Sequence, residues 1–170
     1  MAGDPAATLA LLDEAGSAAT VASAGGRYFG FVIGGSYPVA VAANWLATAW
    51  DQDAALPVMS PVAARLHEVV TGWLTELFGL PAGTAVFVSG ASMANTTALA
   101  AARDHQLAQA GWDVQADGLF GAPELTVVIG EYAHSTVLKA LGLVGLGRNR
   151  VRRVPADEQG RMRADCLPRT

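Results

Sequence analysis

The sequence is 170 residues long and 52% hydrophobic, so it can bury one sizeable core. Its formal net charge of −4 and pI of about 5.2 give no electrostatic support for a nucleic-acid partner. The single cysteine, Cys166, excludes a disulfide framework and a zinc–cysteine cluster, and we expect a cytoplasmic protein without a metal site. No early cations of a secretory signal are present, and the longest apolar run, residues 39–50, is too short to span a bilayer. We therefore expect no membrane partner.

The first third of the chain is predicted to be mainly helical. Residues 5–22 form an alanine-rich, weakly amphipathic pattern typical of a helix, and glycines end it at residues 25–26. Residues 27–38 mix glycines with aromatic and β-branched side chains, which indicates an extended or irregular segment. The apolar run at 39–50 then predicts a buried helix.

The clearest helix of the chain follows Ser60. Ser60 is a suitable N-cap and Pro61 suits the first helical position. Apolar residues recur at helical spacing as far as Phe78, and Gly79 ends the pattern. We expect the resulting apolar stripe to lie in the core.

Residues 85–101 hold the most informative pattern. We predict a buried strand over residues 85–89, a tight turn at Gly90 and Ala91, and a helix from Ser92. The first turn of a helix has unpaired N–H groups and partial positive charge, so it can cradle a phosphate. An ordinary strand-turn-helix with Ser92 as N-cap would show the same spacing. Spacing alone leaves both interpretations open.

The second half alternates strands and helices. We predict strands over residues 125–130 and 150–154 with a helix over residues 135–143 between them, which indicates an α/β fold with a largely parallel sheet. Ligands of such sheets bind outside the carboxyl ends of the strands. Ser92 and the segment 131–135 both follow such ends, and this shared location favours the phosphate interpretation.

Of three histidines, His134 has the best claim to a function. It follows a predicted strand, whereas His67 and His105 fall within predicted helices as ordinary solvent-facing residues. An imidazole at a strand end can stack on a planar cofactor or move a proton. A lone histidine is more commonly an ordinary surface or core residue, so position alone does not decide its role.

Five segments, in the same order, resemble segments of the group II pyridoxal-phosphate-dependent decarboxylases, which have the aspartate-aminotransferase fold (fold type I). The segments are Arg27-Tyr28-Phe29-Gly30-Phe31 (H-P-R-F-F-G in the family), Ser60-Pro61 with Leu66 and Glu68 (S-P-x-x-x-x-L-E), residues 89–95 (S-G-G-T-E-A-N), His134-Ser135-Thr136 with Lys139-Ala140 (H-x-S-x-x-K-A), and Val154-Pro155 with Gly160 and Met162 (V-P-x-D-x-x-G-x-M). The resemblance implies an incomplete large domain of the PLP-dependent transferase fold over residues 56–170, preceded by an N-terminal helical arm over residues 1–55.

The resemblance also implies a cofactor, pyridoxal 5'-phosphate, and the residues that hold it. Gly90, Ala91 and Ser92 correspond to the phosphate-binding turn. His134 would stack on the pyridine ring and help to return a proton to the carbon that loses carbon dioxide, and Thr136 would contact the cofactor. Ala91 stands where the family has glycine, which is compatible with phosphate binding if the local φ is negative.

The chemistry of this cofactor also needs a lysine that anchors it and a carboxylate that holds its ring nitrogen protonated. Lys139 is the only lysine, and it matches the family's K-A pair rather than the anchoring position. We therefore expect an N-terminal fragment of a longer amino-acid decarboxylase, homodimeric when complete. The fragment alone is expected to be inactive and marginally stable, because three strands would leave a sheet edge and apolar faces uncovered.

Two other functions fit the same residues. The chain could be a non-catalytic remnant that binds a phosphate ligand or dimerises with a full-length homologue. It could also belong to an aminotransferase or lyase of the same fold, since the residues that direct bond cleavage lie mostly outside the matched segments. The substrate amino acid cannot be inferred from residues 27–37.

Overall fold

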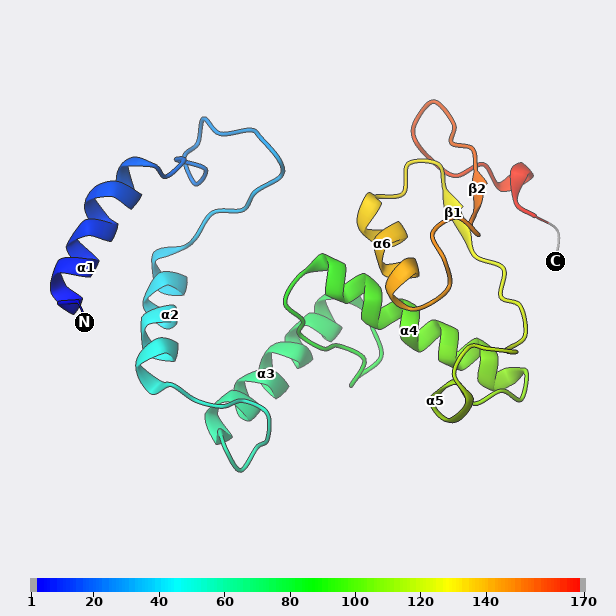
Figure 1. Ribbon diagram of the computed structural model, residues 1–170, viewed down its shortest axis with the longest axis horizontal. Helices are drawn as coiled ribbons and strands as arrows, with labels where there is room; N and C mark the ends of the chain where they lie inside the picture. Colours follow the sequence, from blue (N-terminus) through cyan, green and yellow to red (C-terminus); the bar gives the residue numbers. More distant parts are fainter. Residues whose placement is uncertain (1–2, 169–170) are drawn as a thin grey trace. The chain divides into compact units, whose positions relative to one another are not determined.

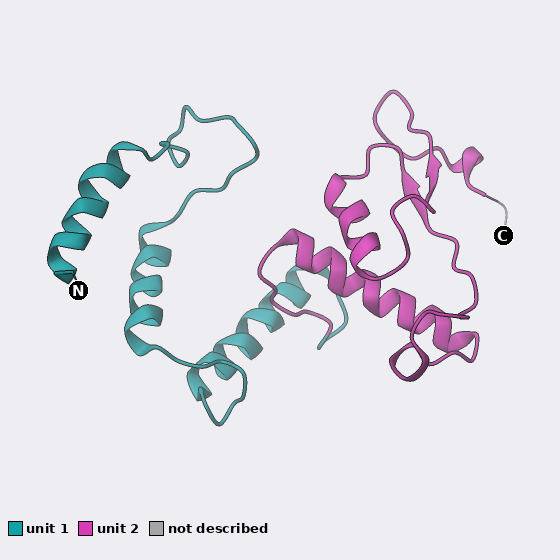
Figure 2. Cartoon of the chain, viewed as in Figure 1, with its two compact units in different colours: residues 1–83 teal, residues 84–170 magenta. Residues whose placement is uncertain are grey.

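The computed structural model describes residues 3–168. The chain divides into two compact units, Met1–Gly83 and Thr84–Thr170 (Figure 2). It is mostly helical, with a short parallel sheet in the second unit (Figure 1). The predicted boundary between residues 55 and 56 separates two domains of the family, whereas the boundary after Gly83 separates two compact units. The compact units do not test the domain boundary, which stays a prediction.

The first unit begins with helix α1, Pro5–Leu12, which continues through a π-helical turn, η1, Asp13–Ser17. Asp4 caps α1, because its carboxylate accepts a 3.0 Å hydrogen bond from the N–H of Ala6. The helix expected over residues 5–22 is therefore confirmed, although it ends several residues earlier.

The glycine-rich segment that follows is irregular, as expected for residues 27–38, and extends as far as Tyr37. Phe31 and Val32 have φ values of 56° and 53°. Non-glycine residues, and β-branched ones above all, rarely adopt this left-handed conformation. The chain thus reaches the next helix along a locally strained path.

Helices α2, Pro38–Trp50, and α3, Pro61–Phe78, lie where the sequence predicts them. The Ser60 hydroxyl caps α3 by accepting a hydrogen bond of 3.4 Å from the N–H of Ala63. Gly79 ends α3 with a φ of 62°, the left-handed conformation that closes many helices. Local signals at the two ends were sufficient to place this helix.

The burial expected of both helices is wrong. No described residue of α2 is buried, and Trp45 exposes 72% of its surface. The apolar stripe of α3 is also exposed, with Trp73 at 65%, and the one buried residue of that helix is Thr75. An amphipathic stripe is buried only if another element covers it, and no described element of the first unit covers these two helices.

The second unit contains the core of the molecule. Its elements are α4 (Ala91–Gln109), α5 (Val114–Asp117), β1 (Val128–Gly130), α6 (Ser135–Leu143), β2 (Arg152–Val154) and the 3₁₀ turn η2 (Ala164–Cys166). β1 and β2 pair in parallel, with Val128 opposite Arg152 and Gly130 opposite Val154. The parallel sheet is thus confirmed, with strands shorter than predicted.

The strand expected over residues 85–89 is not formed. The segment has no regular secondary structure, and among the described residues the sheet consists of β1 and β2 alone. A strand exists only where a neighbouring strand completes its hydrogen-bond ladder, and neither β1 nor β2 does so for this segment. The predicted buried strand is therefore wrong both in its pairing and in its burial, since Val86 and Phe87 expose 66% and 56% of their surface.

Helices α4 and α6 pack against each other and supply most of the core. The buried apolar residues of the described chain all lie in this unit: Leu107, Ile129, Ala140, Leu141, Val144 and Val154. α6 connects β1 to β2, so its packing on α4 also fixes where the carboxyl end of β1 points. The site described below lies at that end.

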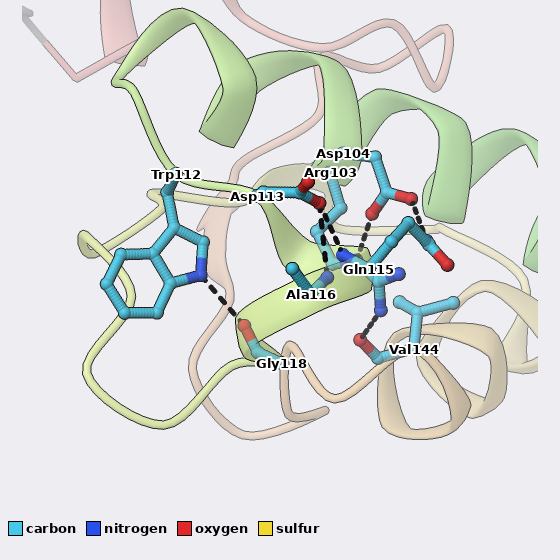
Figure 3. A network of polar contacts seen from close by, with 8 residues as sticks. All are labelled: Arg103, Asp104, Trp112, Asp113, Gln115, Ala116, Gly118 and Val144. Carbon is cyan, nitrogen blue, oxygen red and sulfur yellow. Dashed lines mark hydrogen bonds and ion pairs between the residues drawn. The ribbon is translucent and has the colours of Figure 1, made fainter.

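A polar network holds the opposite end of α6 (Figure 3). The Arg103 guanidinium on α4 donates a 2.7 Å hydrogen bond to the carbonyl of Val144, the C-cap of α6. It also contacts the Asp104 carboxylate at 2.8 Å, and Asp104 accepts a 2.8 Å bond from the Gln115 amide of α5. This bond to Arg103 holds the pKa of Asp104 below its ordinary value of 3.8. The end of α6 is thereby tied to α4 and α5.

The short helix α5 is fixed by its own turn. The Asp113 carboxylate caps it, accepting from the N–H groups of Gln115 at 2.9 Å and Ala116 at 3.2 Å. The Trp112 indole donates a 2.8 Å bond to the Gly118 carbonyl and so closes the turn (Figure 3).

Of the helices in residues 3–168, none combines the length and apolarity that crossing a membrane requires.

Candidate cofactor-binding site

The N-terminus of α4 is an open helix end. Gly90 is its N-cap, with extended φ and ψ of 162° and 176°, and no side chain caps the first turn. The alternative with Ser92 as N-cap is therefore wrong, because α4 starts one residue earlier and Ser92 lies inside it. A methyl group added at Gly90 would meet no atom within 4 Å, so space lies in front of the turn.

The alanine in this turn is compatible with its position. Ala91 is the first residue of α4, and it is not among the described non-glycine residues with positive φ. Its methyl group therefore causes no backbone strain. The N–H groups of Ala91 and Ser92 belong to the first turn, where a helix offers donors and partial positive charge to an anion.

His134 lies at the start of α6, after the carboxyl end of β1. It is the N-cap of α6, and its Nδ1 accepts a hydrogen bond of 3.2 Å from the N–H of Thr136. The same Nδ1 lies 2.9 Å from the Thr136 hydroxyl. The imidazole is exposed, so the N-cap contact orients the ring without burying it.

Asn95 joins the two helix ends. Its side-chain Nδ2 on α4 donates a 3.2 Å hydrogen bond to the Thr136 hydroxyl on α6. This contact brings together three of the predicted residues, Ser92 on one helix and His134 and Thr136 on the other. Asn95 itself was not predicted as a site residue, although it closes the matched segment at 89–95 and lies three residues after Ser92, on the same face of the helix.

A cleft of about 1000 Å³ opens beside these helix ends. It is lined by residues of α4, α6 and the loop before β2: Ser92, Ser135, Thr136, Leu138, Lys139, Gly142, Leu143, Gly147, Arg148, Asn149 and Arg150. Ser92 and Thr136 thus line the cleft, whereas Gly90, Ala91 and His134 do not.

The wall of the cleft carries positive charge. Lys139 and Arg148 are exposed on it, and Arg150 forms an ion pair of 2.8 Å with Glu124. Cations along a cleft raise the local concentration of anionic ligands. Within the described part of the chain, no group of three or more His, Cys, Asp or Glu residues could hold a metal ion. The site is therefore suited to a phosphate or carboxylate group.

Known relatives match most of the chain. L-2,4-diaminobutyrate decarboxylase of Acinetobacter baumannii is 30% identical over 139 residues, which cover 76% of this chain and 26% of the relative. Cysteine sulfinic acid decarboxylase of Mus musculus is 30% identical over 143 residues, 84% of this chain and 28% of the relative. The chain thus spans about a quarter of the length of these curated relatives.

Solved structures agree in fold. The crystal structure of mouse CSAD in its apo form superposes with a TM-score of 0.87 at 26% identity, covering 98% of this chain and 34% of that one. The structure of Oryza sativa TDC with PLP and tryptamine gives a TM-score of 0.78 at 24% identity, covering 94% of this chain and 35% of that one. The expected fold, an incomplete α/β domain of the PLP-dependent transferase type, is confirmed.

The family follows from a match along most of the sequence. The model described as the pyridoxal-dependent decarboxylase conserved domain matches residues 23–170, well over half of the chain. Pyridoxal phosphate is the cofactor of that family, and the matched residues include both helix ends of the site. The chain belongs to the pyridoxal-dependent decarboxylase family.

Proposed function

We propose that this chain forms the phosphate-binding part of a pyridoxal-phosphate-dependent amino-acid decarboxylase. The observation that carries the proposal is the uncapped first turn of α4, held by the Asn95–Thr136 hydrogen bond beside the first turn of α6. Family membership supports decarboxylation over the aminotransferase and lyase alternatives.

The residues of the turn fit a phosphate group. The backbone N–H groups of Ala91 and Ser92 and the Ser92 hydroxyl would bind its oxygens, and the absence of a side chain at Gly90 leaves room for close approach. The Thr136 hydroxyl lies on the wall of the same cleft as Ser92. These donors supply hydrogen bonds and partial positive charge without a charged side chain of their own.

When bound, pyridoxal phosphate supplies an electron sink that stabilises the negative charge left as a carboxylate departs as carbon dioxide. The role proposed for His134 is to stack on the cofactor ring and to hold a proton for that carbon. Its Nδ1 is engaged by Thr136, so Nε2 is the nitrogen that remains for a substrate or cofactor atom.

We also propose that the complete enzyme is a cytoplasmic homodimer. Large apolar side chains are exposed along α2 and α3, and an assembled enzyme would cover them. The substrate class is an amino acid. Relatives named for diaminobutyrate and for cysteine sulfinic acid differ in the charge of the substrate side chain, and no residue described above selects between these charges.

Binding of pyridoxine 5'-phosphate, compared with pyridoxine, tests the phosphate site. Neither compound has the aldehyde that would react with Lys139, so amide chemical shifts of the 170-residue chain report reversible binding alone. We expect the phosphate ester to shift the signals of Ala91 and Ser92 and pyridoxine to leave them in place. Equal responses to the two compounds would contradict the proposal.

Variants identify the donors. Ser92→Ala removes a hydroxyl, and Ala91→Pro removes one N–H at a position where proline fits a helix. Loss of one hydrogen bond to an ionised group costs about 1.5–3 kcal/mol, so each variant should weaken binding by roughly tenfold or more. Thr97→Ala, an exposed residue farther along α4, is the matched control and should bind normally.

The unmodified chain with added cofactor is expected to release no carbon dioxide, and release would contradict its expected inactivity.

A further inference from the structure

We propose that Asn95 and Thr136 are positioning residues that hold the ring of His134 as one neutral tautomer, with the proton on Nε2. The inference rests on the proposed function only for what that ring does in the enzyme. The tautomer itself follows from hydrogen bonds within the second unit.

The direction of each hydrogen bond follows from the Asn95 amide. Its Nδ2 can only donate, so the Thr136 hydroxyl oxygen accepts that bond, 3.2 Å long. The hydroxyl proton is then free to point to His134 Nδ1, 2.9 Å away. A chain of donors thus runs from α4 through Thr136 to the ring.

A second donor reaches the same ring nitrogen. The backbone N–H of Thr136 points to His134 Nδ1 at 3.2 Å, the bond that makes His134 the N-cap of α6. A proton on Nδ1 would place N–H against N–H there, so this backbone contact requires an unprotonated Nδ1, and the Thr136 hydroxyl then donates to the same nitrogen. The neutral ring therefore carries its proton on Nε2, which neither contact uses.

Differences in burial explain why the ring needs these partners. Asn95 and Thr136 are half-buried, whereas His134 is exposed, so its hydrogen bonds rather than burial orient the ring. Asn95 also follows Ser92 by three residues on α4, so the helix that offers the phosphate turn also reaches the ring through Thr136. Phosphate binding and ring orientation would then depend on the same helix.

Nitrogen NMR of the 170-residue chain tests the tautomer. With three histidines, long-range ¹H–¹⁵N spectra at alkaline pH, where imidazole rings are neutral, resolve each ring, and His134→Gln assigns the one of interest. We expect the Nδ1 shift of a fully unprotonated nitrogen for His134. Free imidazole groups already favour the Nε2–H form, so the shift of the unmodified chain alone does not test the inference. The difference in the Nδ1 shift between the unmodified chain and its variants does.

Asn95→Asp is the sharpest variant. The aspartate has the same shape but can only accept, so it would take the Thr136 hydroxyl proton and withdraw it from Nδ1. The Thr136 backbone N–H still donates to Nδ1, so we expect the Nδ1 shift of His134 to move only part of the way towards the average of the two tautomers. Thr136→Val should produce the same change, and Thr136→Ser, which keeps the hydroxyl, should restore the original shift. His105, on α4, is the internal control and should keep its shifts.

An unchanged Nδ1 shift in both Asn95→Asp and Thr136→Val would overturn the inference, as would an averaged shift in the unmodified chain. Amide spectra of α4 and α6 report whether a variant is folded. If Thr136→Val does not fold, the Asn95→Asp result alone tests the inference. Failure of the proposed function is a separate outcome: pyridoxine 5'-phosphate would fail to bind while the tautomer remained fixed.

Discussion

The two compact units contain similar amphipathic helices with opposite burial. In the second unit α6 packs on α4, and Leu141 exposes 0% of its surface. In the first unit the stripe of α3 is as regular in sequence, yet Leu66 on it is 54% exposed. The contrast shows that periodicity identifies the face a helix can bury, whereas burial depends on a partner. For α6 the partner is α4 of the same unit, and for α3 none lies among the described residues of the first unit.

The largest expected effect comes from matched leucine substitutions in the two units. Leu141→Ala should destabilise the second unit by about 2–5 kcal/mol, because it leaves a cavity between α4 and α6. Leu66→Ala, on an exposed face, should change stability by less than about 0.5 kcal/mol. Hydrogen exchange in increasing urea measures both, with the α4 and α6 amides reporting Leu141→Ala and the α3 amides reporting Leu66→Ala. Equal losses would show that the stripe of α3 is covered in solution.

A similar comparison applies to two arginines. Arg103 exposes 14% of its side chain and binds both the Val144 carbonyl and Asp104, whereas Arg65 exposes 75% in a pair with Glu68. Arg103→Ala leaves partly buried acceptors without a donor, and we expect a loss of about 1.5–3 kcal/mol. Arg65→Ala should cost less than about 0.5 kcal/mol. Exchange of the α4 and α6 amides measures the first cost and exchange of the α3 amides the second. A negligible cost at Arg103 would mean that the network in Figure 3 does not hold α6.

Local signals in the sequence were enough to place α2, α3 and α6, but not the short helix α5. Ser60 and Gly79 fixed the ends of α3, and the helix predicted over residues 135–143 coincides with α6. Caps and terminating glycines act within one turn, so their effect does not depend on the rest of the fold. Three of the predicted site residues, Ser92, His134 and Thr136, lie at the starts of α4 and α6, which pack against each other in the second unit.

The features that the sequence did not predict depend on contacts between residues far apart in the sequence. The strand at residues 85–89 needed a neighbour, and the burial of α2 and α3 needed a covering element. The contact from Asn95 to Thr136 joins residues 41 apart in sequence, and no local pattern in either helix specifies it. Family resemblance supplied the cofactor and the order of the segments, but not the hydrogen bonds that orient His134.

The next effect in size concerns the cap of α3. Ser60→Ala removes the hydroxyl that accepts from the N–H of Ala63, and loss of an N-cap costs about 1 kcal/mol. Because no described element packs over the stripe of α3, the cost should appear as faster exchange in its first turn only. Ser60→Asp, which keeps a capping oxygen, is the control. Faster exchange in α4 and α6 as well would show that the two units unfold together.

The smallest effect is a pH dependence confined to the second unit. The Arg103 side chain holds the pKa of Asp104 below its ordinary value of 3.8. A carboxyl group with a lowered folded pKa stabilises the folded state above its unfolded value, and that stability is lost as the pH falls through the folded value. Urea resistance of α4 and α6 should therefore fall on the acid side of 3.8, and Asp104→Asn should flatten the decline. If Asp104→Asn loses stability in acid as the unmodified chain does, other carboxylates cause the loss. Asp157 is then the next residue to replace, because its hydrogen bonds from Arg161 also lower its pKa.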